Sequence, residues 1–309
     1  MVGGAYAFSG PNPLFGLGRI AEAQSAEELL KAYAAKDSDT DNLPDWQEAL
    51  YGTDPNNPES FRAGIMDGEA VAQGLVTPKV AVRPEEEPTD PESIPGIAAA
   101  PASLTDRFAQ TLLQQYLANR GQNPPSQQEI VSFVEAGVAN LTEESASPAR
   151  YAASDLHASS DTLAAYAAQA EAVFAARTVS ADKNELSYFA DALKGDDAAL
   201  AKIDAISDAY AAIAAGLVAT PVPAEARQAH LAIANALAHL SEASGDMAAM
   251  QTDPVRALVG ISLYDRYAEE LVAAFANLNG IFAARQVTIP EGSAGYYIVK
   301  TARDAAASR

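Results

Sequence analysis

The stretch LAKIDAISDAYAAIAAGL, from Leu200 to Leu217, decides the fold class. Its large apolar residues recur at spacings of three and four, which places them on one side of a helix. They are Leu200, Ile203, Ile206, Tyr210, Ile213 and Leu217. A seam of this kind packs against other helices, so the chain is predicted to be mainly α, with a C-terminal helical bundle.

Helical patterns lie on both sides of this seam. They comprise the stripe Phe108-Leu112-Tyr116, a capping box at Ser126 and Glu129, a helix from Asp161, shorter and longer helices over about 185–193 and 224–243, and one that opens at Asp253-Pro254. Abundant alanine lets helix backbones approach closely, and no fixed-period repeat follows Leu104. A single bundle is therefore favoured over a solenoid.

The C-terminal pieces RQVTIPEG and GYYIVK are short runs of strand-forming residues. They can pair with each other as a small β-hairpin, or with RYAASDLHAS. The predicted fold therefore has room for a small β-hairpin beside the helices, with the pairing partner left open.

Composition excludes several classes of protein. The chain has 309 residues and a formal net charge of -21, which repels the phosphates of nucleic acids and anionic lipid surfaces. It contains no cysteine, which excludes disulfides and thiolate zinc sites. No apolar run approaches the roughly 18 residues that a spanning helix needs.

Four regions are predicted. Residues 1–35 form an N-terminal tail or helix, 36–74 an EF-hand-like calcium module, 75–104 a proline-rich acidic linker, and 105–309 the α-helical domain. The linker contains RPEEEPTDPE, whose prolines forbid helix and whose acids repel one another, so it is expected to be extended.

The calcium module rests on the stretch KDSDTDNLPDWQEALYGTDPNNPES, from Lys36 to Ser60. A twelve-residue calcium loop supplies oxygens from positions one, three, five, seven, nine and twelve. The corresponding residues are Asp37, Asp39, Asp41, the carbonyl of Leu43, Asp45 (directly or through water) and Glu48. Position six needs a positive φ, and Asn42 tolerates that conformation next best after glycine. The sequence therefore predicts one Ca²⁺ site.

A solvated acidic turn is the alternative interpretation, since Asp and Asn are common in turns. Five carboxylates in register are costly to gather without a counterion, which favours calcium. An unpaired loop of this kind binds Ca²⁺ with a dissociation constant of about 10⁻⁴ to 10⁻³ M. Such a site would be nearly empty in a low-calcium cytosol, so an exported location is expected.

This stretch, with its continuation YGTDPNNPES, resembles the bacterial thrombospondin type 3 repeat, an EF-hand-like calcium module. In that family a second loop follows, which here starts at Glu59. Phe61, Ala63 and Ala70 replace the acids expected at positions three, five and twelve, while Glu59, Asp67 and Glu69 remain. The resemblance implies one calcium site and a second loop that is a degenerate, apolar-packed relic, with Asp54 helping to bridge or cap.

The whole layout is similar to a group of surface proteins from candidate-phyla bacteria. That resemblance implies an N-terminal membrane anchor, of which MVGGAYAF would be the remnant, and no enzymatic activity. The expected function is a non-enzymatic, calcium-stabilised, extracytoplasmic scaffold or adhesion protein with protein partners at the cell surface. The alternatives are an accessory subunit of a pilus or secretion apparatus, and a hydrolase of envelope polymers.

The histidines do not suggest catalysis. His157 lies in SDLHASSD without the elbow spacing of a serine hydrolase. His230 and His239 are nine residues apart and fall on opposite faces of a helix, so each is predicted to be a boundary or surface residue.

Overall fold

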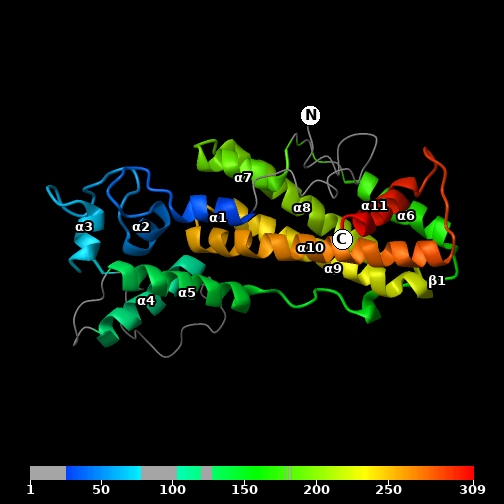
Figure 1. Ribbon diagram of the computed structural model, residues 1–309, viewed down its shortest axis with the longest axis horizontal. Coiled ribbons are helices and arrows are strands. Elements are labelled where there is room, and N and C mark those ends of the chain that lie inside the picture. Colours follow the sequence, from blue (N-terminus) through cyan, green and yellow to red (C-terminus); the bar gives the residue numbers. More distant parts are fainter. Residues whose placement is uncertain (1–25, 78–102, 120–126, 178, 180, 182) are drawn as a thin grey trace, which may run out of the picture. The chain divides into compact units, whose positions relative to one another are not determined.

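The computed structural model describes residues 26–77, 103–119, 127–177, 179, 181 and 183–309. Within these residues the chain forms helices α1 to α11, two short 3₁₀ turns and one two-stranded sheet (Figure 1). The mainly α fold class is therefore confirmed. No helix in the described ranges has the length and apolar character that crossing a membrane requires.

The chain divides into two compact units. Unit 1 comprises the described residues up to Lys31 together with Thr142–Ala249 and Val259–Arg309. Unit 2 comprises the described residues of Ala32–Leu141 and of Met250–Leu258. This division does not follow the predicted boundary at residue 105, because the first helices after the linker cluster with the calcium module.

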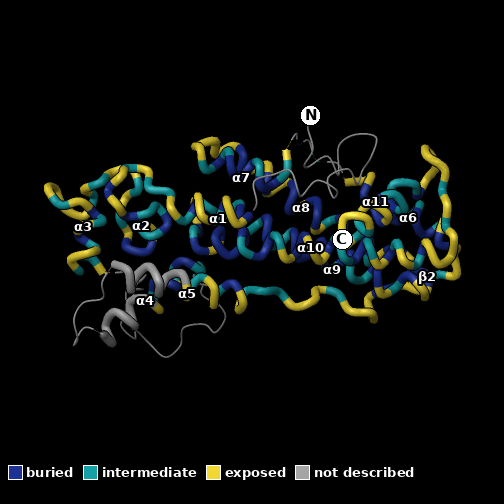
Figure 2. Tube along the Cα trace, viewed as in Figure 1, coloured by how far each residue is buried: buried dark blue, intermediate teal, exposed yellow. Residues whose placement is uncertain are grey.

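Unit 1 is a helical bundle. Its helices are α6 (Leu163–Ala175), α7 (Glu185–Leu193), α8 (Ala198–Val218), α9 (Arg227–Ala248), the larger part of α10 (Pro254–Ala284) and α11 (Tyr296–Ala307). Figure 2 shows buried residues recurring along α8 to α10, with exposed and intermediate residues between them. The core is therefore made by helix faces.

The predicted seam is the buried face of α8. All six of its apolar residues are buried, and Ile203, Ile206 and Ile213 have no exposed surface. The α8 helix packs against α9, where Gly245 allows a close approach and the Ser207 hydroxyl donates to the Ser241 carbonyl at 2.7 Å. The alternating spacings of three and four residues place these apolar side chains on one face of α8, and that face packs against a neighbouring helix, as expected.

The predicted β-hairpin is wrong. The sheet pairs β1 (Ala158–Ser159) with β2 (Val222–Pro223), and the strands are parallel. RQVTIPEG contains no strand, and the residues of GYYIVK begin α11 after Gly295. A six-residue apolar run cannot be assigned to helix or strand by periodicity alone, and α11 extends well past it.

Close backbone packing explains where α11 begins. Gly295 has φ of 91°, and a side chain there would lie within 3.0 Å of the backbone of Ala167 and Ala168 on α6. The Tyr297 N–H donates to the Glu171 carboxylate at 2.7 Å. Glycine at this position therefore both permits the turn and brings α11 onto α6.

Unit 2 contains the end of α1 (Ala26–Ala34), then α2 (Asp45–Tyr51), α3 (Asp67–Ala72), α4 (Leu104–Asn119) and most of α5 (Gln127–Ser145). Gly137 of α5 lies against the ring of Phe108 on α4, which is buried. The N-terminal tail, the linker from 78 to 102 and the Ser126 half of the predicted capping box lie outside the described residues.

Asp253 caps two helices in unit 2. Its carboxylate accepts from the Arg256 N–H at the start of α10, and also from the N–H groups of Leu104 and Thr105 at the start of α4. The Thr105 hydroxyl donates to Asp253 at 2.6 Å and accepts from the Val255 N–H. The predicted helix start at Asp253-Pro254 is confirmed, and the same carboxylate serves α4.

Candidate metal centre

The loop after α1 has the backbone of an ion-binding loop. Asn42 has φ of 73°, as its place at position six predicts, and Thr40 has φ of 63°. The Asp37 carboxylate accepts from the N–H groups of both residues, at 2.8 Å from Thr40 and 3.0 Å from Asn42. Local hydrogen bonds therefore curl the chain around the first acidic residue.

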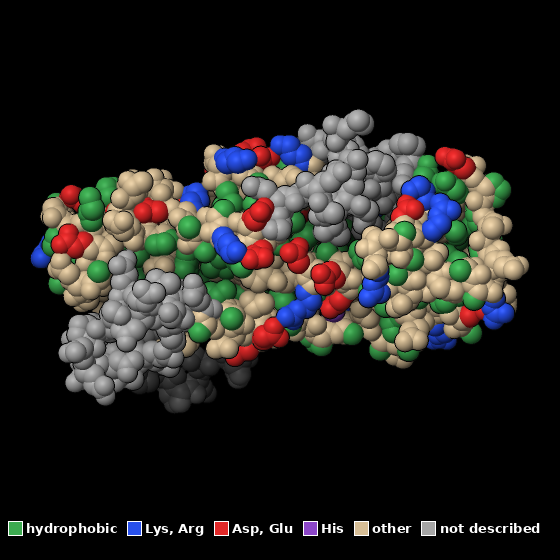
Figure 3. Space-filling view, in the orientation of Figure 1, with side chains coloured by type: hydrophobic (Ala, Val, Ile, Leu, Met, Phe, Trp, Pro, Cys, Tyr) green, Lys and Arg blue, Asp and Glu red, His purple; other side chains and the backbone are tan. Residues whose placement is uncertain are grey.

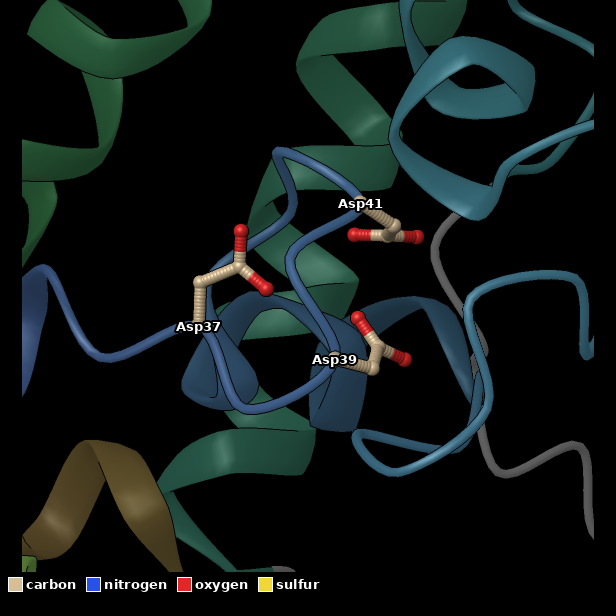
Figure 4. A group of neighbouring side chains, drawn as sticks. All are labelled: Asp37, Asp39 and Asp41. Carbon is tan, nitrogen blue, oxygen red and sulfur yellow. The ribbon is translucent and has the colours of Figure 1, made fainter.

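Three aspartates of this loop lie together. Figure 4 shows the carboxylates of Asp37, Asp39 and Asp41 turned toward a common space inside the loop. One oxygen from each lies within 4.8 Å of the others. At this separation two like charges repel by about 3 kcal/mol in a medium of effective dielectric constant 20.

A second acidic group shares Asp41 and is fully buried. Oxygens of Asp41, Glu48 and Asp67 also lie within 4.8 Å of one another, and the three residues are 1%, 0% and 0% exposed. Glu48 comes from α2 and Asp67 from the first residue of α3. The acids of two successive loops therefore converge at Asp41.

Several of these oxygens are buried without a hydrogen-bond partner. This holds for both carboxylate oxygens of Asp39 and both of Glu48. No Lys or Arg of the described residues forms an ion pair with the acids of the two groups. A buried carboxylate without donor or counterion is strongly unfavourable, so the donor set fits a bound cation.

The same crowding changes the proton affinity of two carboxylates. Burial raises the pKa of Glu48 to about 8; the neighbouring Thr53 hydroxyl opposes this rise, and the charges of Asp39 and Asp41 reinforce it. Burial raises the pKa of Asp39 as well, with a contribution from the charge of Asp41. Without an ion, a proton on Glu48 would relieve part of the repulsion.

Asp45 lies apart from the two acidic groups. Its carboxylate accepts from the Ser38 N–H at 2.7 Å and from the Ser38 hydroxyl at 2.8 Å, and it forms an ion pair with Lys36. Leu43 is buried, and its N–H donates to Asp41 at 2.8 Å. The structure thus places Asp37 and Asp39 in one acidic group and Glu48 in the other, with Asp41 in both, while Asp45 closes the loop on its outside.

The second loop repeats the backbone of the first, 22 residues further along the chain. Gly64 occupies the positive-φ position at 86°, and its N–H donates to Glu59 as that of Asn42 does to Asp37. The helix that follows starts at Asp67, as the first starts at Asp45. The second loop therefore has the backbone of the first, with Phe61, Ala63 and Ala70 at the positions where the first loop has acids.

The apolar replacements in the second loop do not all pack inward. Ala70 is fully buried, but Phe61 is 43% exposed. The expectation of an apolar-packed relic therefore fails at Phe61, which stands at the surface of the loop. Asp54, expected to bridge or cap, is exposed, and its carboxylate accepts from the N–H of Asn56.

Asp67 is the site residue that sequence reasoning missed. In sequence, Asp67 is one of the acids of the second loop and lies away from the first loop. Its position nine is that of Asp45 in the first loop, and Asp45 lies outside both acidic groups, so the sequence carries no signal that identifies Asp67 as a site residue. Only the three-dimensional folding of one loop onto the other brings Asp67 to Asp41.

Trp46 is placed to report on this site. It is the first residue after Asp45 in α2, it is 4% exposed, and its indole N–H donates to the Ala34 carbonyl at 2.9 Å. This bond ties the end of α1 to the helix that carries Glu48. A change in the loop will therefore alter the surroundings of the indole.

The prediction of a boundary or surface position is wrong for His230, whereas His239 lies at the edge of the core beside the half-exposed Glu270. His230 has no exposed surface, accepts from the Tyr166 hydroxyl at 3.0 Å and donates to the Leu217 carbonyl at 2.9 Å, and burial lowers its pKa. His239 is 7% exposed and contacts Glu270 and the Pro148 carbonyl. An alanine-rich α9 buries more of its circumference than the sequence pattern indicates.

The pocket beside His230 carries no acid. Tyr166, Phe174, Leu217, His230, Ile233 and Phe275 are among its lining residues, and none of the residues that line it is a carboxylate. The surrounding core is apolar. Both nitrogens of His230 form hydrogen bonds within the fold, to Tyr166 and Leu217. These contacts account for His230 as a structural residue.

Comparison with known proteins gives no relative. No protein-family model, no curated protein and no solved structure matches the chain.

The site can therefore be described from its own chemistry. Asp41, Glu48 and Asp67 form a buried acidic cluster that can hold a metal ion. Every side chain in the two acidic groups offers a carboxylate oxygen as its ligand atom.

Proposed function

We propose that the loop from Asp37 to Glu48 binds Ca²⁺, and that the chain is a calcium-stabilised, non-enzymatic scaffold or adhesion protein outside the cytoplasm. The resemblance to the bacterial thrombospondin type 3 repeat supports this proposal. The single observation that carries it is Glu48, whose two oxygens are buried without a partner at the position where a calcium loop places its closing carboxylate.

The donor chemistry favours calcium over a transition metal. The two acidic groups offer only carboxylate oxygens, and hard oxygen ligands suit Ca²⁺ and Mg²⁺, whereas zinc and copper sites use histidine or cysteine. Calcium accepts six to eight oxygens in flexible geometry, while magnesium demands a near-ideal octahedron. A loop with several carboxylates on one side fits calcium better.

The ion would act mechanically. It neutralises acids that repel one another and fixes the loop between α1 and α2, so the helices that follow keep a defined direction. A weak site of this class fills at millimolar calcium, which is found outside the cytoplasm. Protein partners are the expected ligands of the helical surfaces. Figure 3 shows acidic and basic side chains interspersed on one face, without a continuous basic surface for nucleic acid.

A calcium titration of the full chain, followed by the fluorescence of Trp46, tests the proposal. Trp46 is the only tryptophan, so the signal reports on α2 alone. We expect a saturable change with a midpoint between about 10⁻⁴ and 10⁻³ M, and a much weaker response to Mg²⁺. Calorimetry on the same sample should give the same midpoint.

Two variants sharpen the titration. Asp39→Asn removes one charge from the centre and should weaken binding tenfold or more. Glu69→Gln makes the same change of charge at an exposed residue of α3 and should leave the midpoint unchanged. The absence of any response by fluorescence and calorimetry at 10 mM Ca²⁺ would overturn the proposal.

A further inference from the structure

Asp67 plays the part in the second loop that Asp45 plays in the first. The Ser60 N–H and hydroxyl both donate to Asp67, at 3.0 and 2.5 Å, as those of Ser38 donate to Asp45. The Phe61 N–H adds a third bond to Asp67 at 2.8 Å. The two aspartates thus hold equivalent backbone turns, each at the start of its helix.

The two aspartates differ in how their charge is balanced. Asp45 forms an ion pair with Lys36, which lies just before the first loop. The residue equivalent to Lys36 in the second loop is Pro58, which cannot neutralise an acid. Asp67 is nevertheless 0% exposed, and no Lys or Arg in the described ranges forms an ion pair with it.

Asp67 faces two further carboxylates, those of Asp41 in the first loop and Glu48 in α2, and no cationic side chain of the described residues within ion-pair distance. The Asp41 carboxylate accepts from the Gly68 N–H at 3.0 Å, which joins two residues of different loops. A side chain at Gly68 would come within 2.4 Å of the Asp41 carbonyl oxygen, so the glycine permits this approach. In the first loop the equivalent residue is Trp46, which is large. The second loop is therefore built to come into contact with the first.

An independent observation points to a ligand at this junction. Glu48, which shares the buried group with Asp41 and Asp67, has no exposed surface and no hydrogen-bond partner for either oxygen. Three buried carboxylates, of which Glu48 has no hydrogen-bond partner, fit a ligand at this position. The bonds that Asp67 accepts from Ser60 and Phe61 are of the kind that usually orient a ligating carboxylate.

We propose that Asp67 is a ligand of the calcium ion held by the first loop, so that one divalent cation fastens the two loops together. This inference rests on the proposed function. The second loop then has a use without an ion of its own: it supplies a carboxylate and closes over the site. Its other former ligand positions, Phe61 and Ala63, are free to be apolar.

Calorimetric titration of the full chain with CaCl₂ tests the proposal, with Asp67→Asn as the variant. We expect its calcium affinity to fall about tenfold or more, since even outer contacts of metal ligands are worth 10- to 100-fold. Glu69→Gln, two residues away on the exposed side of α3, is the matched control and should bind as the parent does.

A second variant guards against a simple folding defect in Asp67→Asn. Gly68→Ala leaves every carboxylate in place but forces the two loops apart, and it should also weaken binding. Gly280→Ala, a helix glycine with open space around it, is its control and should not change the affinity. Urea unfolding without calcium shows whether each variant keeps a folded unit 2.

Hydrogen exchange supplies a readout of the fastening itself. Calcium should slow exchange at the Ser60, Phe61 and Gly68 amides in the parent, and should fail to do so in Asp67→Asn even at saturating calcium. If the parent binds calcium and both variants bind it equally well, this proposal is overturned while the proposed function stands. If the parent binds no calcium, both are overturned together.

Discussion

Glu48 is a residue whose charge depends on what lies beside it. In the folded chain without an ion, burial raises its pKa from an ordinary value of 4.5 to about 8. Between these two values the folded state keeps a proton that the unfolded chain has released. Glu48 should therefore cost the ion-free protein no stability below about pH 4.5, and should lower its free energy of unfolding progressively as the pH rises from there to about 8.

Urea unfolding at a series of pH values, with calcium removed by chelation, measures this loss. Glu48→Gln cannot ionise, so its stability should not show the same decrease, and at pH 8 it should be the more stable protein without calcium. In millimolar calcium the order reverses, because the parent gains binding energy and the variant does not. A parent whose stability is flat between pH 5 and 8 would contradict the raised pKa.

Thr40 carries backbone strain. Its φ of 63° is in the left-handed region, where a β-branched side chain is disfavoured and the cost is of order 1–3 kcal/mol. Asn tolerates this conformation better, so Thr40→Asn should raise the free energy of unfolding by about 1 kcal/mol. The reverse change at the neighbouring positive-φ residue, Asn42→Thr, should lower it. Urea unfolding measures the change in free energy of unfolding for both variants. Changes of the same sign in the two variants would contradict the assignment of strain.

At the scale of elements, the segment from Pro148 to Ala153, which leads into a 3₁₀ turn, is held against α9 by side chains of that helix. The Asn235 amide accepts from the Tyr151 N–H at 2.8 Å and donates to the Tyr151 carbonyl at 3.1 Å. Arg227 donates to the Ala153 carbonyl at 2.9 Å, and His239 contacts that of Pro148. Because these bonds go to backbone atoms, they hold the segment whatever its sequence.

Asn235→Ala should free this segment. Removing one side chain leaves two backbone groups without partners, which costs about 1–3 kcal/mol where the group is desolvated. We expect a loss of stability in this range and faster exchange of the Tyr151 amide. Arg150→Ala breaks only the exposed pair with Glu242 and should cost less than about 1 kcal/mol. Equal effects of the two variants would show that Asn235 is not the anchor.

Elements with a long apolar pattern were predictable, and short ones were not. The α8 seam and the Asp253-Pro254 start follow from periodicity and capping, which are local properties. GYYIVK was read as strand because β-branched and aromatic residues favour strands, yet packing against α6 makes it helical. The strand preference of six residues is easily outweighed when those residues pack against another part of the fold.

At the scale of the whole molecule, unit 2 is assembled from segments far apart in the chain. Tyr33 donates to the Met250 carbonyl at 3.2 Å, and Asp253 caps α4 at Leu104 and Thr105. Four acids of the two groups, Asp37, Asp39, Asp41 and Glu48, were nevertheless predictable as neighbours, because they lie within twelve residues of one another in the sequence. Asp67 was not, since it reaches the site through the fold of a second loop. The capping of α4 by Asp253 was not predictable either, because Leu104 and Thr105 lie far from Asp253 in the sequence.

The division into units predicts which part of the chain an ion bound as proposed would stabilise. The acids of the metal centre all lie in unit 2, so the ion should stabilise that unit by mass action on its folded form. Hydrogen exchange with and without calcium should show slower exchange in α2 and the two loops. Amides in the middle of α8, which belongs to unit 1, should exchange at the same rate in both conditions. Equal protection of α8 and α2 would mean that the chain unfolds as a single cooperative unit, and the ion would then stabilise all of it.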